Sequence, residues 1–203
     1  MLSFQKLVWL IIYAIFFLAI NIISYKHFVK QKSFSLLISI CLVAILEAAT
    51  SLYIDTLWVY QYSFIFIGIL SIMTISDLQN MEVPTWTLIA LPASAIVSFV
   101  FLCLQSSSIL WANIAIAIIT WMLLTILALL FNDNLGGADI IMIFCVCLLF
   151  GGTHMLYMLI IGSLVSIIGM WVYSKIKKTQ FTGTTLPFLP GLTLGFLIAC
   201  FLV

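Results

Sequence analysis

ILWANIAIAIITWMLLTILALLF, residues 109–131, contains no charged side chain. Because a helix needs about 20 predominantly apolar residues to cross the hydrocarbon core of a bilayer, this stretch alone is long enough to span a membrane. The rest of the chain has the same character: of 203 residues, 66% are hydrophobic and 6% are charged, and the mean hydropathy is +1.36. This composition lies outside the range of soluble globular domains, so we predict an integral membrane protein.

Eight apolar windows follow one another along the chain. They are continuously apolar and lack the alternation of barrel strands, which favours helices. We therefore predict an all-α polytopic membrane protein, with residues 1–203 forming a single domain of about eight transmembrane helices. The predicted windows are 7–25, 34–54, 57–76, 86–104, 109–131, 140–152, 154–173 and 186–203. The sixth is short and ends at Gly151-Gly152, so it is predicted as either a thin crossing or a half-buried helix.

The lysines predict the orientation of these helices, because cytoplasmic loops collect positive charge. Six of the seven basic residues form two clusters: Lys26, Lys30 and Lys32 after the first window, and Lys175, Lys177 and Lys178 after the seventh. The even number of windows between the clusters places both in the cytoplasm and both chain termini outside it. The first window is long and has no small-residue cleavage pattern, so we expect a retained helix instead of a signal peptide.

Several classes of protein are disfavoured by what the sequence lacks. The five cysteines all lie inside apolar windows and none belongs to a Cys-x-x-Cys pair, so we predict small core residues and no zinc or other metal site. Neither a nucleotide-binding loop nor a basic nucleic-acid patch is present. We therefore expect no cofactor and no nucleic-acid partner.

Two aspartates stand at the edges of apolar windows, in SDLQNMEVPT (residues 76–85) and NLGGAD (residues 134–139). Carboxylates at such places are costly and usually mark a functional site. Asp77 is expected to end a helix, where the helix dipole disfavours its charge. Asp139 is expected to open the sixth window, so an N-cap role is its alternative interpretation. The window boundaries place both aspartates at the cytoplasmic face.

The residues around the two aspartates are of the kinds expected at a functional site. Gly136 and Gly137 would let a backbone or a substrate approach Asp139 closely, and Pro84 suits the first turn of the helix that follows Asp77. If the two carboxyl groups lie together they share one proton, so that the ionised group acts as a base and the protonated group as an acid. Which aspartate begins protonated is left open, although a helix N-terminus would favour a charged Asp139.

These two stretches resemble the aspartate motifs of the type IV prepilin peptidases. Asp77 followed by Val83-Pro84 is similar to the first motif of that family, and GGAD (residues 136–139) is similar to its Gly-x-Gly-Asp motif. Three further stretches agree in the same order along the chain: NIISYK (residues 21–26), Glu47, and LPFLPG (residues 186–191). The resemblance therefore covers nearly the whole chain.

The resemblance implies a membrane aspartic endopeptidase with Asp77 and Asp139 as catalytic residues. Such an enzyme removes the leader peptide from pilin or pseudopilin precursors at the cytoplasmic face of the cytoplasmic membrane. The stretch that contains Pro187, Pro190 and Gly191 would form a wall for the substrate helix, or simply a kinked helix start. Membrane lipid is expected around the helices. Whether the substrates serve a type IV pilus, competence or secretion, and which oligomer forms, cannot be read from the sequence.

Some features depart from the family. The loop after the first helix lacks the four-cysteine insert of the long-form enzymes, which leaves N-methyltransferase activity open. Ile141 stands where the family often carries a lysine, and Gln79, Asn80 and Glu82 stand where it carries basic residues.

The alternative function is a proton-coupled transporter in which Glu47, Asp77 and Asp139 form a relay. The absence of an internal repeat and the placement of both aspartates at one face argue against it. A catalytically inactive relative that acts as a scaffold is a third alternative. Glu47 lies inside the second window and is predicted to be neutral or paired, with a hydrogen-bonding role favoured over a catalytic one. Loop positions are predicted for the remaining polar candidates: Asp55, Glu82, Asp133 and His154.

Overall fold

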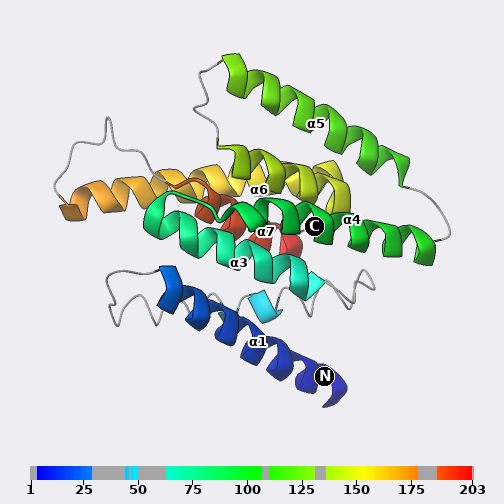
Figure 1. Ribbon diagram of the computed structural model, residues 1–203, viewed down its shortest axis with the longest axis horizontal. Coiled ribbons are helices and arrows are strands. Elements are labelled where there is room, and N and C mark those ends of the chain that lie inside the picture. The colour runs from blue at the N-terminus through cyan, green and yellow to red at the C-terminus, as the bar shows by residue number, and fades with distance from the viewer. Residues whose placement is uncertain are drawn as a thin grey trace.

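The computed structural model describes residues 4–28, 44–45, 47–49, 63–106, 110–130, 136–177 and 187–202. Six helices are labelled in these ranges (Figure 1): α1 Phe4–Phe28, α3 Ser63–Asn80, α4 Thr85–Ser106, α5 Trp111–Leu130, α6 Gly137–Lys177 and α7 Leu189–Leu202. No strand occurs in this part of the chain, and the predicted all-α fold class is confirmed there.

The helix bounds follow the predicted apolar windows closely. Over the described ranges, three helical segments are long and apolar enough to cross a membrane: Thr85–Leu104, Trp111–Leu130 and Gly137–Val172. Shorter apolar helical segments cover Ile11–Ile23, Ile65–Leu78 and Leu189–Leu202. Most of the second window, 34–54, lies outside the described residues. The protein is thus a helical membrane protein, while the number of eight crossings and the side of each terminus stay predictions.

The chain reverses its direction at Gly151, inside α6. The backbone there has φ 82° and ψ 179°, a conformation that glycine alone adopts without strain. On a straight helix Met142 and Met158 would stand about 24 Å apart. Both nevertheless reach neighbouring turns of α7, where Met142 meets Thr193 and Met158 meets Gly195. The predicted windows 140–152 and 154–173 are therefore the two halves of α6, and α7 contacts both of them.

Asn113 of α5 lies against this break. Its side-chain Nδ2 donates a hydrogen bond of 3.4 Å to the carbonyl of Leu148. A Cβ placed on Gly151 would come within 3.1 Å of the Asn113 Oδ1 atom. A carbonyl beside a helix break needs a substitute partner in an apolar environment, and the amide of Asn113 supplies it.

Small residues let α7 pack closely against the second half of α6. Gly191 and Gly195 are spaced by four on α7, as are Gly162 and Ser166 on α6. A Cβ on Gly195 would lie 2.5 Å from the carbonyl oxygen of Met158 and 2.6 Å from the backbone nitrogen of Gly162. This is the small-residue spacing that draws membrane helices together.

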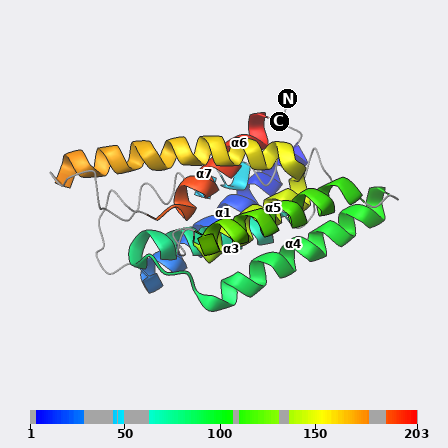
Figure 2. The same cartoon turned by 90° about the horizontal axis from the view of Figure 1, so that it is seen from above.

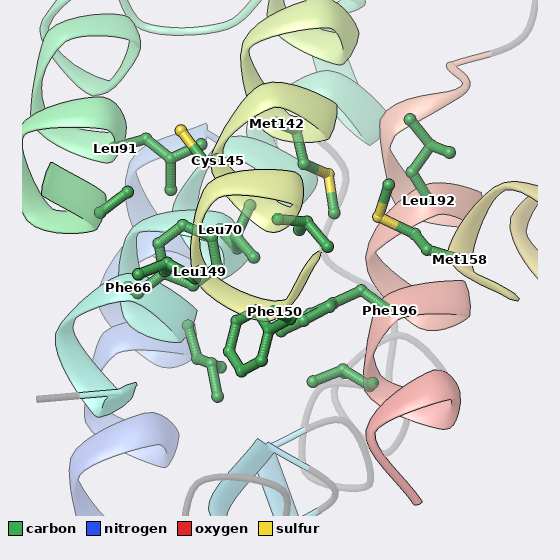
Figure 3. Close-up of a cluster of buried hydrophobic side chains, with 14 of the residues drawn as sticks. Phe66, Leu70, Leu91, Met142, Cys145, Leu149, Phe150, Met158, Leu192 and Phe196 are labelled. Atoms are coloured by element: carbon green, nitrogen blue, oxygen red, sulfur yellow. The ribbon is translucent and has the colours of Figure 1, made fainter. Parts of the chain in front are cut away.

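Aromatic side chains pack between α7, α3 and the first half of α6. Phe196 of α7 lies 5.2 Å from Phe150 and 6.0 Å from Phe66, measured between ring centroids (Figure 3). These rings come from α7, from the end of the first half of α6 and from α3. The first half of α6 is buried on nearly all sides by other helices, and whether window 140–152 crosses the membrane stays a prediction.

The remaining helices cover this centre. α1 and α3 run parallel. Gly68 of α3 contacts Phe16, Phe17 and Ile20 of α1. Further along the two helices, Ser71 of α3 and Asn21 of α1 both form a hydrogen bond with Glu47. Figure 2 shows α4 and α5 on the side of the molecule opposite the long second half of α6. α5 exposes most of its apolar surface, as expected of a helix that faces lipid.

Candidate active site

Asp77 lies in the last turn of α3. Its backbone carbonyl accepts a 2.9 Å hydrogen bond from the N–H of Met81, which has a φ of 53° and closes the helix with a left-handed cap. The Asp77 carboxylate in turn accepts a hydrogen bond from the backbone N–H of Leu189, the first residue of α7. A charge that its own helix dipole disfavours therefore faces the positive end of a second helix.

The start of α7 has few other free donors. Leu192 N–H bonds to the carbonyl of Phe188 at 3.1 Å, so Phe188 caps the helix and Leu189 occupies its first position. Pro190 follows and has no N–H to donate. The hydrogen bond from Leu189 to Asp77 thus satisfies a donor that the helix itself leaves free.

Asp139 lies in the first turn of α6. The N–H groups of Asp139 and Ile140 both bond to the carbonyl of Gly136, so Gly136 is the N-cap and Asp139 is the third helical residue. The Asp139 carboxylate accepts a hydrogen bond from the backbone N–H of Gly136, as the acid of a capping box does. The predicted helix start is confirmed, whereas the alternative reading of Asp139 as the N-cap is wrong by three residues.

The fold brings Asp77 and Asp139 together although they are far apart in the sequence. The charge of Asp77 acts directly on the Asp139 carboxyl group. Asp139 is 8% exposed and Asp77 is half-buried, and burial weakens the screening of their repulsion. The end of α3 and the starts of α6 and α7 thus form one cluster that holds two interacting carboxyl groups.

Of the two glycines predicted to shape the site, Gly136 is the one in contact with it. A Cβ on Gly136 would lie 2.9 Å from Oδ2 of Asp139, whereas a Cβ on Gly137 would meet nothing within 4 Å. An alanine at position 136 must therefore displace the Asp139 carboxylate, whereas an alanine at position 137 need not, so the two variants can be compared directly.

We expect Gly136→Ala to lower any activity of the carboxyl pair by about tenfold or more, because small misplacements of a reacting group are costly. Gly137→Ala should keep full activity, and the added alanine favours the helix. Turnover of the two variants at equal expression in membranes measures the difference. Equal activities of the two variants would contradict a placement of Asp139 by Gly136.

Pro84 belongs to the short connection between α3 and α4. The N–H and the hydroxyl of Thr87 bond to the carbonyl of Pro84 at 2.9 and 2.6 Å, so Pro84 caps α4 and precedes its first turn. The hydroxyl of Ser76 donates to the carbonyl of Glu82 at 2.7 Å. These bonds fix the connection against the turn that carries Asp77, and the predicted location of Pro84 beside the site agrees with them.

The predicted wall residues divide into two groups. Pro187 and Pro190 flank the residues that begin α7, next to the Leu189 N–H that reaches Asp77. Gly191 instead faces the second half of α6, where a Cβ would overlap the hydroxyl of Ser166 and come within 2.7 Å of the carbonyl oxygen of Gly162. Gly191 therefore acts in helix packing, and its predicted place in a substrate wall receives no support from these contacts.

Glu47 is fully buried in a separate polar cluster. Asn21 Nδ2 donates to its Oε2 at 2.9 Å, and the hydroxyl of Ser71 is hydrogen-bonded to its Oε1. The cluster ties α1 and α3 to the helical segment around Glu47. Within the described ranges, no hydrogen bond joins Glu47 to either aspartate of the pair. This arrangement agrees with the favoured hydrogen-bonding role of Glu47. It gives no hydrogen-bonded path for protons from Glu47 to Asp77 or Asp139 within the described ranges.

The other sequence candidates lie elsewhere. Asp55 and Asp133 are outside the described residues, and Glu82 is exposed on the connection before α4. His154 is buried in α6, where its Nδ1 lies 3.0 Å from the carbonyl of Phe150, so the predicted loop position is wrong. In the described part of the chain, no three histidine, cysteine, aspartate or glutamate side chains converge on a point where a metal could bind.

Sequence reasoning missed several contacts around the site and at the break in α6. The Leu189 N–H beside Asp77, the Thr74–Thr193 contact at 2.8 Å and the amide of Asn113 at the Gly151 break were not among the candidates. Only the close packing of α6 and α7 could have been predicted, from the spacing of their small residues. The other contacts depend on which face each helix turns toward its neighbours.

Comparisons with protein-family models, curated proteins and solved structures find no match to this chain. The chemistry of the two carboxyl groups therefore has to carry the functional argument.

Proposed function

We propose that this membrane protein is an aspartic endopeptidase that removes the leader peptide of type IV prepilin-like precursors. The feature that carries the proposal is the closeness of Asp77 and Asp139, which lie near enough for their charges to interact where three helix ends meet. Two carboxyl groups so placed share a proton, which provides a base and an acid in one site. The motifs around both aspartates agree with the same family.

In the proposed reaction a water molecule lies between the two carboxyl groups and the scissile peptide. The ionised carboxylate takes a proton from the water as its oxygen attacks the carbonyl carbon, and the protonated carboxyl donates to the carbonyl oxygen. The carboxyl group that took the proton from water then donates it to the departing amine as the C–N bond breaks, while a hydroxyl of the tetrahedral intermediate returns a proton to the other carboxylate as the new C=O bond forms. The hydrogen bonds from Leu189 to Asp77 and from Gly136 to Asp139 hold the two carboxyl groups in place during these transfers.

The charges of the chain fit a basic leader as substrate. Between Lys32 and Lys175 the sequence contains no lysine or arginine, and all six acidic residues fall in this interval. The acids Asp77 and Asp139 would attract a positively charged peptide segment to the pair. The apolar helix that follows the leader in such a precursor would lie in the bilayer beside the site.

We place the pair on the cytoplasmic side of the cytoplasmic membrane. α1 and α3 run parallel, so Lys26 near the end of α1 and Asp77 near the end of α3 lie toward the same end of the bundle. α7 and the second half of α6 run antiparallel, as Gly191 meets Ser166 and Gly195 meets Met158. Lys175 therefore lies beyond the level of the start of α7, again toward Asp77. Both lysine-bearing helix ends support a cytoplasmic position by the positive-inside rule.

Leader cleavage in membranes tests the proposal directly. A prepilin co-expressed with the intact chain should be shortened by its leader, as seen by a mobility shift and by sequencing of the new N-terminus. Membranes without the chain should leave the same prepilin uncut. Failure to cut any of several prepilins would refute the peptidase proposal, and proton-flux measurements in vesicles would then examine the transporter alternative.

The cleavage rate is expected to fall at both low and high pH. At low pH both carboxyl groups are protonated and no base remains, while at high pH both are ionised and no acid remains. Rates of prepilin cleavage in proteoliposomes across the pH range measure the two limbs, whose apparent pKa values belong to the pair as a unit. Glu82→Gln should keep both limbs, since Glu82 is exposed outside the pair. A rate that rises steadily with pH, without a second limb, would contradict the shared-proton mechanism.

A further inference from the structure

Thr193 lies at a junction of three helices behind the carboxyl pair. It is buried in the second turn of α7, and its Oγ1 atom lies 2.8 Å from Oγ1 of Thr74 on α3. The same atom lies 3.0 Å from the carbonyl oxygen of Leu189 and 4.0 Å from Sδ of Met142 on α6. One hydroxyl group therefore contacts each of the three helices whose ends form the site.

The hydroxyl protons define a direction for these bonds. Thr193 has a single proton, and the carbonyl of Leu189 can only accept it. When Thr193 donates to Leu189, Thr74 must donate to Thr193. Hydrogen bonds then run from α3 through Thr193 to the residue whose own N–H is bonded to Asp77.

The contacts lie about one helical turn from both catalytic candidates. Thr74 precedes Asp77 by three residues, and Met142 follows Asp139 by three residues. A shift of α7 along or around its axis would move the Leu189 N–H away from Asp77 and would also change the packing behind Asp139. The position of Thr193 against α3 is therefore linked to the geometry of the carboxyl pair.

Threonine and serine hydroxyls often bond to the carbonyl four residues earlier in a helix, with no further role. Thr125 and Ser163 do so here, at 2.8 and 2.6 Å from the carbonyls of Trp121 and Leu159. Thr193 differs from them because its oxygen also bonds to a hydroxyl on another helix. Thr125 lies on α5 and its hydroxyl bonds to the carbonyl of Trp121 on the same helix, so it provides a matched control.

We propose that Thr193 and Thr74 form a positioning pair that holds the start of α7, and with it the Leu189 N–H, in register with Asp77 and Asp139. The catalytic part of this proposal rests on the proposed peptidase function, while the structural part concerns the carboxyl groups themselves. The pair does not touch the substrate and acts through the geometry of the two carboxyl groups.

The kinetic test compares hydroxyl removal at the junction with hydroxyl removal elsewhere. Thr193→Val and Thr74→Val should each lower kcat for prepilin cleavage by about tenfold or more, with KM changed less than about twofold because the substrate contacts remain. Thr193→Ser keeps the hydroxyl and should restore most of kcat. The double valine variant should lose no more than the worse single variant, since both remove one shared bond. Thr125→Val should behave as the intact chain.

A second measurement does not need a substrate. The chain contains only four aspartates, Asp55, Asp77, Asp133 and Asp139, so selective ¹³C labelling of aspartate gives four carboxyl signals that single asparagine variants assign. At fixed pH, Thr193→Val should move the signals of Asp77 and Asp139 and leave the other two in place. Thr125→Val should move none of them.

These measurements separate the positioning proposal from the peptidase proposal. Normal kcat together with unmoved carboxyl signals in Thr193→Val would overturn the positioning role and leave the peptidase intact. Moved signals in a chain that cuts no prepilin would refute the peptidase and keep the positioning role. If Thr193→Val does not fold, Thr74→Val and Thr193→Ser decide the question, and a lowered melting temperature with unchanged kcat would reduce the pair to a purely structural contact.

Discussion

Asparagine at either Asp77 or Asp139 is expected to reduce leader cleavage by about 10³-fold or more, because each variant removes one of the two proton-transfer groups. Asparagine has nearly the same shape as aspartate, and its Oδ1 atom can still accept the N–H of Leu189 at position 77 or of Gly136 at position 139. The helix ends should therefore stay in place while the chemistry is lost. Initial rates of prepilin cleavage at equal amounts of folded protein measure the effect.

Glu82→Gln is the matched control for these two variants. Glu82 is an exposed acid on the connection that follows α3, close in sequence to Asp77. It should keep cleavage within about threefold of the intact chain, since exposed charges contribute little. The double variant Asp77→Asn with Asp139→Asn should be no less active than either single variant, because the two carboxyl groups act as a unit. Cleavage at the normal rate by either single variant would exclude the pair as the catalytic centre.

Hydropathy predicted the helices well because spanning segments must be both apolar and long. α4 and α5 begin and end within a few residues of their windows, and the glycine pair 151–152 marked the break in α6. Two successive crossings over windows 140–152 and 154–173 imply a reversal of the chain between them, and the structure has its break at Gly151. The positive φ that turns the chain back is a property of the packed structure.

The pairing of Asp77 with Asp139 was expected from their motifs and from their place at one face of the membrane. Their partners were not expected. These helices are apolar on all sides, so no periodicity shows which side chains face inward. The Leu189 N–H is a backbone group that no side-chain pattern reveals, and the contact of Thr74 with Thr193 depends on the crossing of α3 and α7. The contact of Gly191 with the second half of α6 depends on helix packing in the same way.

The second large effect is expected for the helix contact that seats α7. Gly195→Ala places a Cβ 2.5 Å from the carbonyl oxygen of Met158 and 2.6 Å from the backbone nitrogen of Gly162. Both are backbone atoms of α6, so the helices themselves must separate. We expect a loss of about 3 kcal/mol in the free energy of unfolding, at the upper end for overpacked cores. Unfolding in mixed micelles of increasing denaturing-detergent content, followed by circular dichroism, measures it.

Gly169→Ala is the control, because a Cβ on this exposed glycine of α6 meets nothing within 4 Å. Alanine favours a helix over glycine by up to about 1 kcal/mol, so this variant should be as stable as the intact chain or slightly more so. Since α7 carries both Leu189 and Thr193, any Gly195→Ala protein that remains folded should also show altered Asp77 and Asp139 carboxyl signals. Equal stability of the two alanine variants would mean that the glycines of α7 do not pack tightly against α6. It would also contradict the inference that this packing holds the start of α7 in place.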